Sequence, residues 1–140
     1  MAIGESVSML DSIARVTGTV PYASNLELPD MLVGKVFRGS TPHARITGLD
    51  VSAAENLPGI AAIVTAADFG GDDTPNLYFG STIQDQPIVA YDRLRFIGEP
   101  VALIAAESHA IADLAMDLIE LEYEELPAVF EAEEAMMSGA

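Results

Sequence analysis

The sequence has no cysteine and no tryptophan, and few of its residues are aromatic. Without cysteine, the chain cannot form a disulfide, a thiolate zinc site or a cysteine-ligated iron–sulfur cluster. It has no apolar run long enough to span a bilayer, and its start lacks the basic and apolar segments of a secretory signal. We therefore expect a cytoplasmic protein that makes no contact with a membrane.

Positive charge is also scarce. The chain carries 6 Lys and Arg against 22 Asp and Glu, a formal net charge of −16. A field of this sign repels nucleic acid and anionic membrane surfaces, so neither is an expected partner. The acidic excess collects between residues 113 and 134. This stretch is either a solvated face or a surface that docks on a basic partner, and charge patterning alone does not decide between them.

The clearest pattern is a strand, a helix and a second strand between residues 94 and 126. Residues 100–106 form a short apolar run, which is typical of a strand covered on both faces. Residues 109–118 have helical spacing of apolar side chains, and Ser108 is placed to cap that helix. Residues 119–124 alternate apolar side chains with glutamate, which predicts a strand with one wet face. Because a helix between two strands most simply makes a crossover, we expect both strands in one sheet.

Shorter elements are predicted in the rest of the chain. Extended segments are expected from Arg15 and over 31–38, 43–51, 60–65 and 87–90, and short helices over 53–56, 65–69 and 131–137. The prediction is an α+β fold in which one main helix and short helices pack on a mixed sheet of five or six strands. We expect a lead-in segment at 1–13, one domain over 14–136 and a tail at 137–140.

Residues 70–86 show no periodicity and are rich in loop-forming residues. A loop of this length in a compact domain is either functional or disordered. A functional loop would form a pocket for a small ligand or a protein, lined by Phe69, Leu77, Tyr78 and Phe79. A stand-alone binding module is therefore the alternative function.

The two histidines are the first candidates for chemistry. His109 shares a helix face with Asp113 and Asp117, but a single histidine with nearby carboxylates lacks the full ligand set that a metal requires. His43 is expected to form a structural hydrogen bond between a strand and a loop. No Ser or Lys has the setting of an activated nucleophile, so an independent hydrolase is not expected.

Acidic residues also occur close together in the sequence. The candidates for acid–base work are Glu122, Glu124, Glu125, Glu133, Glu134, Asp72 and Asp73. Such work needs a desolvated carboxyl group, whereas the glutamates of 119–124 fall on the wet face of a strand. Asp72 and Asp73 lack the register of a calcium loop, and Gly98 is best explained as a turn residue, with close approach of a ligand as a weaker alternative. From the residues alone we assign no catalytic, cofactor-binding or metal-binding residue.

Several short motifs, in their order along the chain, resemble one family. They are GTVPY at 18–22, LPDML at 28–32, PHARI at 42–46, LPGI at 57–60, RFIGEPVA at 95–102 and EYEELPAV at 122–129. The set resembles the α/β hammerhead domain at the start of the large subunit of molybdenum hydroxylases, the group of xanthine dehydrogenase, aldehyde oxidase and aerobic carbon monoxide dehydrogenase. The resemblance runs from about residue 16 to residue 136. Gly39-Ser40, Asn25 and Glu99 depart from residues common in the family (Ser-Pro, Asp and Gln), which leaves the branch and its substrate open.

The resemblance implies a part in hydroxylation by a molybdopterin enzyme, in which water supplies oxygen to a carbon centre. In that family the pterin-binding loops and the catalytic glutamate lie in later domains, so no such residue is carried over to this chain. The expected role is a scaffold, inactive alone, that packs against the molybdopterin-binding domains. Molybdopterin is expected in the full enzyme, with iron–sulfur clusters and FAD on other domains or subunits. The exposed residues of that contact are predicted to be apolar or basic, such as Phe37, Arg38, Phe79 and Phe96.

Overall fold

The computed structural model describes residues 3–4, 6–71 and 76–137. The chain divides into two compact units, Met1–Met31 and Leu32–Ala140. The first unit contains α1 (Ser12–Val16) and the short 3-10 helix η1 (Ala23–Asn25), and neither has a buried residue. The extended segment predicted from Arg15 is therefore wrong. Arg15 lies in α1, where its guanidinium pairs with Asp11 at 2.6 Å, one helical turn earlier.

The second unit contains the remaining elements. Its longer strands are β1 (Val33–Arg38), β2 (Ala44–Asp50), β3 (Ile60–Val64), β7 (Pro100–Ala106) and β8 (Glu120–Glu125). Its short strands are β4 (Tyr78–Phe79), β5 (Gln86–Pro87) and β6 (Arg93–Leu94), and its helices are α2 (Ser52–Glu55), η2 (Ala66–Asp68), α3 (His109–Leu118) and α4 (Ala132–Ala135). The predicted helix over 109–118 is confirmed, and Ser108 caps it by accepting a hydrogen bond from the Ile111 amide.

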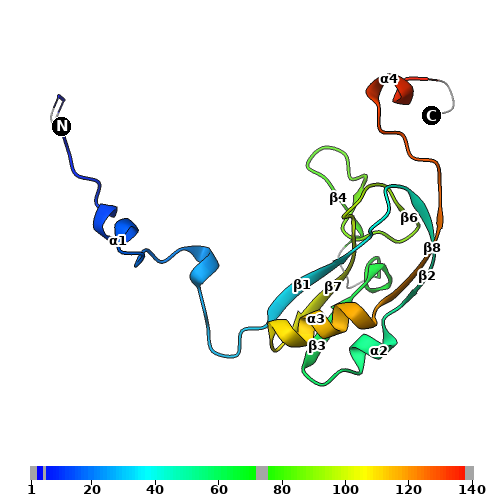
Figure 1. Ribbon diagram of the computed structural model, residues 1–140, viewed down its shortest axis with the longest axis horizontal. Helices are drawn as coiled ribbons and strands as arrows, with labels where there is room; N and C mark the ends of the chain where they lie inside the picture. Colours follow the sequence, from blue (N-terminus) through cyan, green and yellow to red (C-terminus); the bar gives the residue numbers. More distant parts are fainter. Residues whose placement is uncertain (1–2, 5, 72–75, 138–140) are drawn as a thin grey trace. The chain divides into compact units, whose positions relative to one another are not determined.

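The strands form two three-stranded sheets, ordered β1-β7-β3 and β6-β2-β8, and a two-stranded ribbon of β4 and β5. Every pair of strands among the described residues is antiparallel. The α+β class is confirmed, but the prediction of one sheet containing the strands before and after α3 is wrong. Figure 1 shows α3 connecting β7 to β8, and these two strands belong to different sheets. Both edges of β7 are already paired, with β1 and β3, so β8 pairs with β2 instead.

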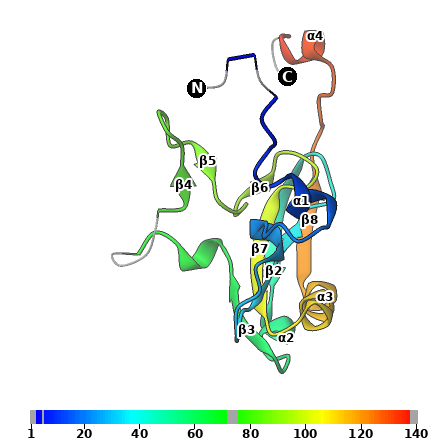
Figure 2. The same ribbon diagram turned by 90° about the vertical axis from the view of Figure 1, so that its left-hand side faces the viewer.

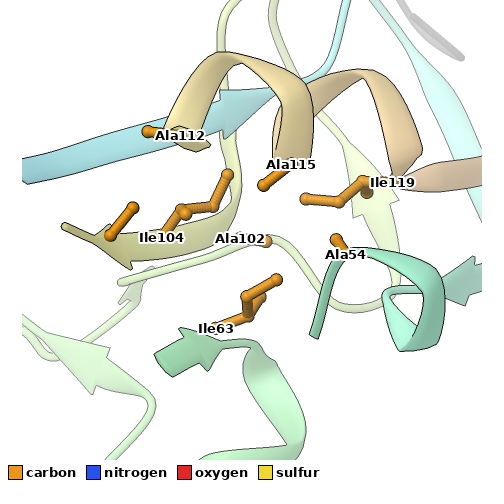
Figure 3. Close-up of a cluster of buried hydrophobic side chains, with 8 residues drawn as sticks. Ala54, Ile63, Ala102, Ile104, Ala112, Ala115 and Ile119 are labelled. Carbon is orange, nitrogen blue, oxygen red and sulfur yellow. The ribbon is translucent and has the colours of Figure 1, made fainter. Parts of the chain in front are cut away.

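Strand β7 contributes to both parts of the hydrophobic core. One cluster joins Ala102, Ile104 and Ala106 of β7 to residues of the neighbouring helices and of β3, which Figure 3 shows in close-up: Ala54, Ile63, Ala112, Ala115 and Ile119. The second cluster joins Val101 of β7 to Ala44, Ala90 and Leu94. The apolar run at 100–106 is thus covered on both sides, as its composition predicts.

The segment predicted to be a long loop, 70–86, contains part of a hairpin. Tyr78 pairs with Pro87 and Phe79 with Gln86, and Figure 2 shows β4 and β5 side by side. Gly80 has a φ of 154°, and a Cβ at this position would lie 1.8 Å from the carbonyl oxygen of Ile83. Only glycine therefore fits this turn. Asp72 and Asp73 lie outside the described residues. No helix in the described part of the chain is long and apolar enough to cross a membrane.

The packing of α3 on β7 can be tested at Ala115, which is fully buried. Ala115→Leu adds side-chain volume to a filled interface and should lower the free energy of unfolding by about 1–3 kcal/mol. Leu114→Ala on the same helix, where the side chain is 55% exposed, should change it by less than about 0.5 kcal/mol. Urea titration of the two variants measures both values. Equal stability of the two variants would contradict this account of the core.

Candidate functional site

Charged side chains cluster around the segment that joins β6 to β7. Asp92 accepts hydrogen bonds from Arg95 Nη2 at 2.7 Å and from Arg93 Nε at 3.2 Å. Glu99 is only 4% exposed, and its carboxylate accepts the Arg95 backbone amide at 2.5 Å and Arg95 Nη1 at 3.3 Å. Arg95 therefore lies between two carboxylates and joins both ends of the turn.

The electrostatics of this cluster favour its charged state. Burial alone would raise the pKa of Asp92. Hydrogen bonds from Arg95 and Arg93 and the charge of Arg95 lower it by more than burial raises it, so the pKa lies below its ordinary value. Burial works against the charged form of Arg95, and its hydrogen bonds and attraction to Asp92 and Glu99 outweigh that effect and raise its pKa. Both groups are therefore ionised at neutral pH.

The turn is also bound to the end of β1. Arg38 Nη1 donates to the carbonyl oxygen of Gly98 at 2.7 Å, and the Gly39 amide donates to the carbonyl oxygen of Glu99 at 3.0 Å. Gly98 has a φ of 91°, a left-handed conformation that glycine adopts without strain. The predicted turn at Gly98 is confirmed, and these bonds fix the backbone that carries Phe96.

Phe96 lies between two hollows in the surface. The larger has a volume of about 610 Å³ and is lined by His43, Arg93, Arg95 and Ile97 and by residues 127–130 after β8. The smaller, of about 360 Å³, is lined by the β4–β5 hairpin and by Glu99. The lining of the larger hollow is mostly apolar, with two arginines and a histidine at its edge.

His43 forms the structural contact that the sequence predicts. Its Nδ1 lies 2.6 Å from the carbonyl oxygen of Pro127, and because a carbonyl oxygen only accepts, Nδ1 carries the proton. The backbone carbonyl of His43 in turn accepts the Leu126 amide at 2.9 Å. These two bonds hold the chain after β8 against the start of β2.

The other predicted candidates lie apart from this cluster. His109 is at the exposed start of α3, and Asp113 of that helix pairs with Lys35 of β1. No group of three or more potential metal ligands occurs among residues 3–4, 6–71 and 76–137. The carboxylates of β8 and α4 are exposed, so the desolvated carboxyl group that acid–base work needs is not found among them; they are Glu122, Glu124, Glu125, Glu133 and Glu134.

Two other predictions need correction. Phe37 was expected at an exposed contact, but it is half-buried, because its side chain packs against both core clusters. Leu77 and Phe79 were expected in one pocket with Phe69 and Tyr78, but they line different hollows. The Tyr78 hydroxyl lies 2.5 Å from the hydroxyl of Tyr91, a contact that no sequence pattern indicates.

The charge cluster itself has no counterpart among the sequence predictions. The spacing of Asp92, Arg95 and Glu99 on either side of a glycine turn was a usable signal, since arginine can reach carboxylates three and four residues away in a tight turn. No pairing was predicted here because the segment has no helical or strand period.

Comparison with known proteins places the chain in a family. Residues 17–127 match the family described as "Aldehyde oxidase and xanthine dehydrogenase, a/b hammerhead domain". The chain belongs to this family. A probable xanthine dehydrogenase subunit of Bacillus subtilis (strain 168) is 39% identical to this hammerhead chain over 130 residues, which are 93% of the chain and 17% of that protein. The "Nicotinate dehydrogenase large molybdopterin subunit" of Eubacterium barkeri is 36% identical over 134 residues, 96% of the chain and 31% of that protein.

Solved structures show the same fold. The reconstituted CO dehydrogenase from Oligotropha carboxidovorans superposes with a TM-score of 0.88 at 33% identity, over 98% of the hammerhead chain and 17% of the other. Quinoline 2-oxidoreductase from Pseudomonas putida 86 gives a TM-score of 0.85 at 37% identity, over 99% and 18% of the two chains. The hammerhead chain thus spans between about a sixth and a third of the length of these relatives.

The buried Glu99 of the hammerhead domain provides a first test of the cluster. Glu99→Ala removes the acceptor of the Arg95 amide and one of the acceptors of its guanidinium, and should lower the free energy of unfolding by about 2–3 kcal/mol. Glu99→Gln keeps a side-chain oxygen for the amide, and should cost about 1 kcal/mol or less. Chemical denaturation at pH 7 measures the free energy of unfolding of both variants. An equal loss of stability in both would show that the hydrogen bond from the Arg95 amide to residue 99 does not stabilise the fold.

A second test uses pH. Because the pKa of Asp92 is lower in the folded than in the unfolded chain, its carboxylate stabilises the fold above the unfolded pKa, and this contribution disappears as the pH falls through the folded pKa. Asp92→Asn should therefore cost about 1 kcal/mol at pH 7, and the difference from wild type should shrink as the pH falls below the unfolded pKa of about 4 and vanish only below the lower folded pKa. Thermal unfolding of both proteins at a series of pH values measures this difference in stability.

The matched control is Asp117→Asn, the same change on an exposed face of α3. We expect it to alter stability by less than about 0.5 kcal/mol at either pH. Similar pH profiles for the two variants would contradict a special role for Asp92.

Proposed function

We propose that this chain is a non-catalytic scaffold domain or subunit of a molybdenum hydroxylase, and that it packs against the molybdopterin-binding domains of the same enzyme. The observation that carries the proposal is that the chain corresponds to 17% to 31% of its relatives, one of which is described as a large molybdopterin subunit. Other parts of those proteins are thus available to hold the reactive centre. The proposal places the enzyme in the cytoplasm.

The residues of the larger hollow do not suit molybdopterin. A pterin phosphate needs cationic side chains that are available to it, but Arg93 and Arg95 are engaged with Asp92 and Glu99. Those two carboxylates would in addition repel a phosphate. We therefore assign no reaction step to this chain. Molybdopterin would be held elsewhere in the enzyme, with iron–sulfur clusters and FAD on other domains or subunits.

The chain's own contribution would be mechanical. The turn between β6 and β7 is held by hydrogen bonds to the end of β1, and the chain after β8 is held by His43. These bonds present exposed apolar side chains, among them Phe96, Ile97 and Phe130, on a fixed backbone. Large exposed apolar side chains gathered in this way are typical of a surface that another protein segment covers.

The extent of the scaffold is part of the proposal. We propose that 14–136 is the hammerhead body, preceded by the lead-in 1–13 and followed by the tail 137–140, of which 138–140 lie outside the described residues.

The relatives are named for xanthine, nicotinate and CO dehydrogenases and for a quinoline oxidoreductase, so their names do not converge on one substrate for this chain.

A stand-alone binding module remains the second candidate function. It is favoured by the smaller hollow, where Phe79 and Pro87 of the β4–β5 hairpin face a space of about 360 Å³ beside Phe96. A small ligand bound there would raise the melting temperature of the isolated chain. A thermal-shift screen with metabolites tests this candidate, since the scaffold function predicts stabilisation by the other enzyme domains and not by metabolites.

The scaffold function is tested most simply by metal analysis and turnover. The purified 140-residue chain should contain no stoichiometric molybdenum and should oxidise neither a purine nor an aldehyde, because the part of the chain that the structure describes offers no site that suits the cofactor. Elemental analysis and a spectrophotometric assay with an artificial electron acceptor measure both properties. Stoichiometric molybdenum in the isolated chain, or turnover by it, would overturn the proposal.

A further inference from the structure

Arg38 differs from every other basic side chain in the described part of the protein. Each other Lys and Arg forms an ion pair: Arg15 with Asp11, Lys35 with Asp113, Arg45 with Glu124, Arg93 with Asp92, and Arg95 with Asp92 and Glu99. Among the described residues, Arg38 has no carboxylate within ion-pair distance. In a chain with a net charge of −16, an exposed guanidinium left without a carboxylate is unexpected.

The Arg38 guanidinium is nevertheless held in place. Arg38 ends β1 at an irregularity in the strand, and its Nη1 donates to the carbonyl oxygen of Gly98 at 2.7 Å. This bond uses one of the five N–H groups of the guanidinium, and the side chain is exposed. A guanidinium fixed in this way loses little further side-chain entropy when it binds a carboxylate through two parallel hydrogen bonds.

Apolar side chains lie next to this arginine. The loop that accepts the Arg38 hydrogen bond carries Phe96 and Ile97, which are 51% and 63% exposed. Phe130, which is 74% exposed, lines the larger hollow together with Phe96 and Ile97. Aromatic and arginine side chains grouped together are typical of the centre of a protein interface, where they dominate the binding energy.

We propose that Arg38, Phe96, Ile97 and Phe130, here called the Arg38 face, dock a segment of the molybdopterin-binding polypeptide that carries a carboxylate beside an apolar side chain. The carboxylate binds the Arg38 guanidinium, and the apolar side chain enters the hollow between Phe96 and Phe130. This inference rests on the proposed scaffold function and adds the chemistry of the partner segment. A second copy of the chain is a poorer occupant, because two bodies of net charge −16 repel one another.

The experiment uses photo-crosslinking in the complete enzyme that contains this chain. A p-benzoylphenylalanine replaces Ile97, and control enzymes carry it at Leu114 on α3 or at Tyr123 on β8, which are 55% and 38% exposed. Mass spectrometry then identifies the crosslinked peptide. The probe at position 97 should crosslink to a peptide outside residues 1–140 that has an Asp or Glu within about one helical turn of the crosslinked residue.

Charge variants test the role of Arg38 in the same enzyme. Arg38→Gln should reduce the crosslink yield at position 97 by about fivefold or more, because an interfacial carboxylate is left without its partner. Lys35→Gln removes the same charge from the same strand, but at a residue that pairs with Asp113 of α3, and should leave the yield unchanged. Circular dichroism of both variants checks that the fold is intact, and the identity of the crosslinked peptide does not depend on either variant.

The outcomes separate the inference from the proposed function. Crosslinks from 114 or 123 to the molybdopterin-binding polypeptide, with none from 97, would overturn the Arg38 face alone. So would a crosslink from 97 to a second copy, a partner peptide without carboxylates, or equal effects of Arg38→Gln and Lys35→Gln. Absence of crosslinks to that polypeptide from all three positions would overturn the scaffold function itself.

Discussion

The full occupation of β7 is the constraint on which the rest of the structure depends. Its two edges pair with β1 and β3, and its side chains contribute to both clusters of the core. A strand in this position cannot accept a further partner, so the chain that leaves it through α3 must find another sheet. The small side chains Ala112 and Ala115 let α3 pack closely on β7, and this brings β8 to the edge of β2.

The charged turn before β7 follows from the same constraint. Because β7 is fixed, the backbone that enters it must reverse direction close to the end of β1, and Gly98 and the Arg95–Glu99 pair stabilise that reversal. The carboxylate of Glu99 is buried only because Arg95 supplies two hydrogen bonds to it. The charged side chains of this cluster therefore hold the loop in place, and the loop in turn holds Phe96 and Ile97 at the surface.

The sequence predicted the local structure better than its assembly. The continuous apolar run over 100–106 and the helical spacing over 109–118 identified β7 and α3, because a strand buried on both faces is apolar throughout and a helix buried on one face repeats its apolar residues about every 3.6 positions. They could not identify the partner of each strand edge, since periodicity describes the faces of a strand and carries no information about its edges. The family motifs identified the domain but did not show which of its strands pair with one another.

The wrong or absent predictions at the candidate site have similar causes. Phe37 was expected at the exposed contact because interfaces are rich in aromatic residues, and only the tertiary structure shows that its side chain packs against both core clusters. The β4–β5 hairpin is too short to produce a period, and its turn depends on Gly80. The unpaired state of Arg38 among the described residues depends on the positions of all the carboxylates around it, which no sequence pattern records.

Hydrogen–deuterium exchange of the 140-residue chain, alone and in the assembled enzyme, tests the central claim most directly. The claim is that β7 is the central strand of a domain that folds by itself, and that the rest of the enzyme covers the exposed loop before β7. The account predicts that the amides of β7 exchange most slowly and equally slowly in both samples, while those of residues 95–98 and 128–130 become protected only in the assembly. Rapid exchange of β7 in the isolated chain, or unchanged exchange at 95–98 on assembly, would contradict it.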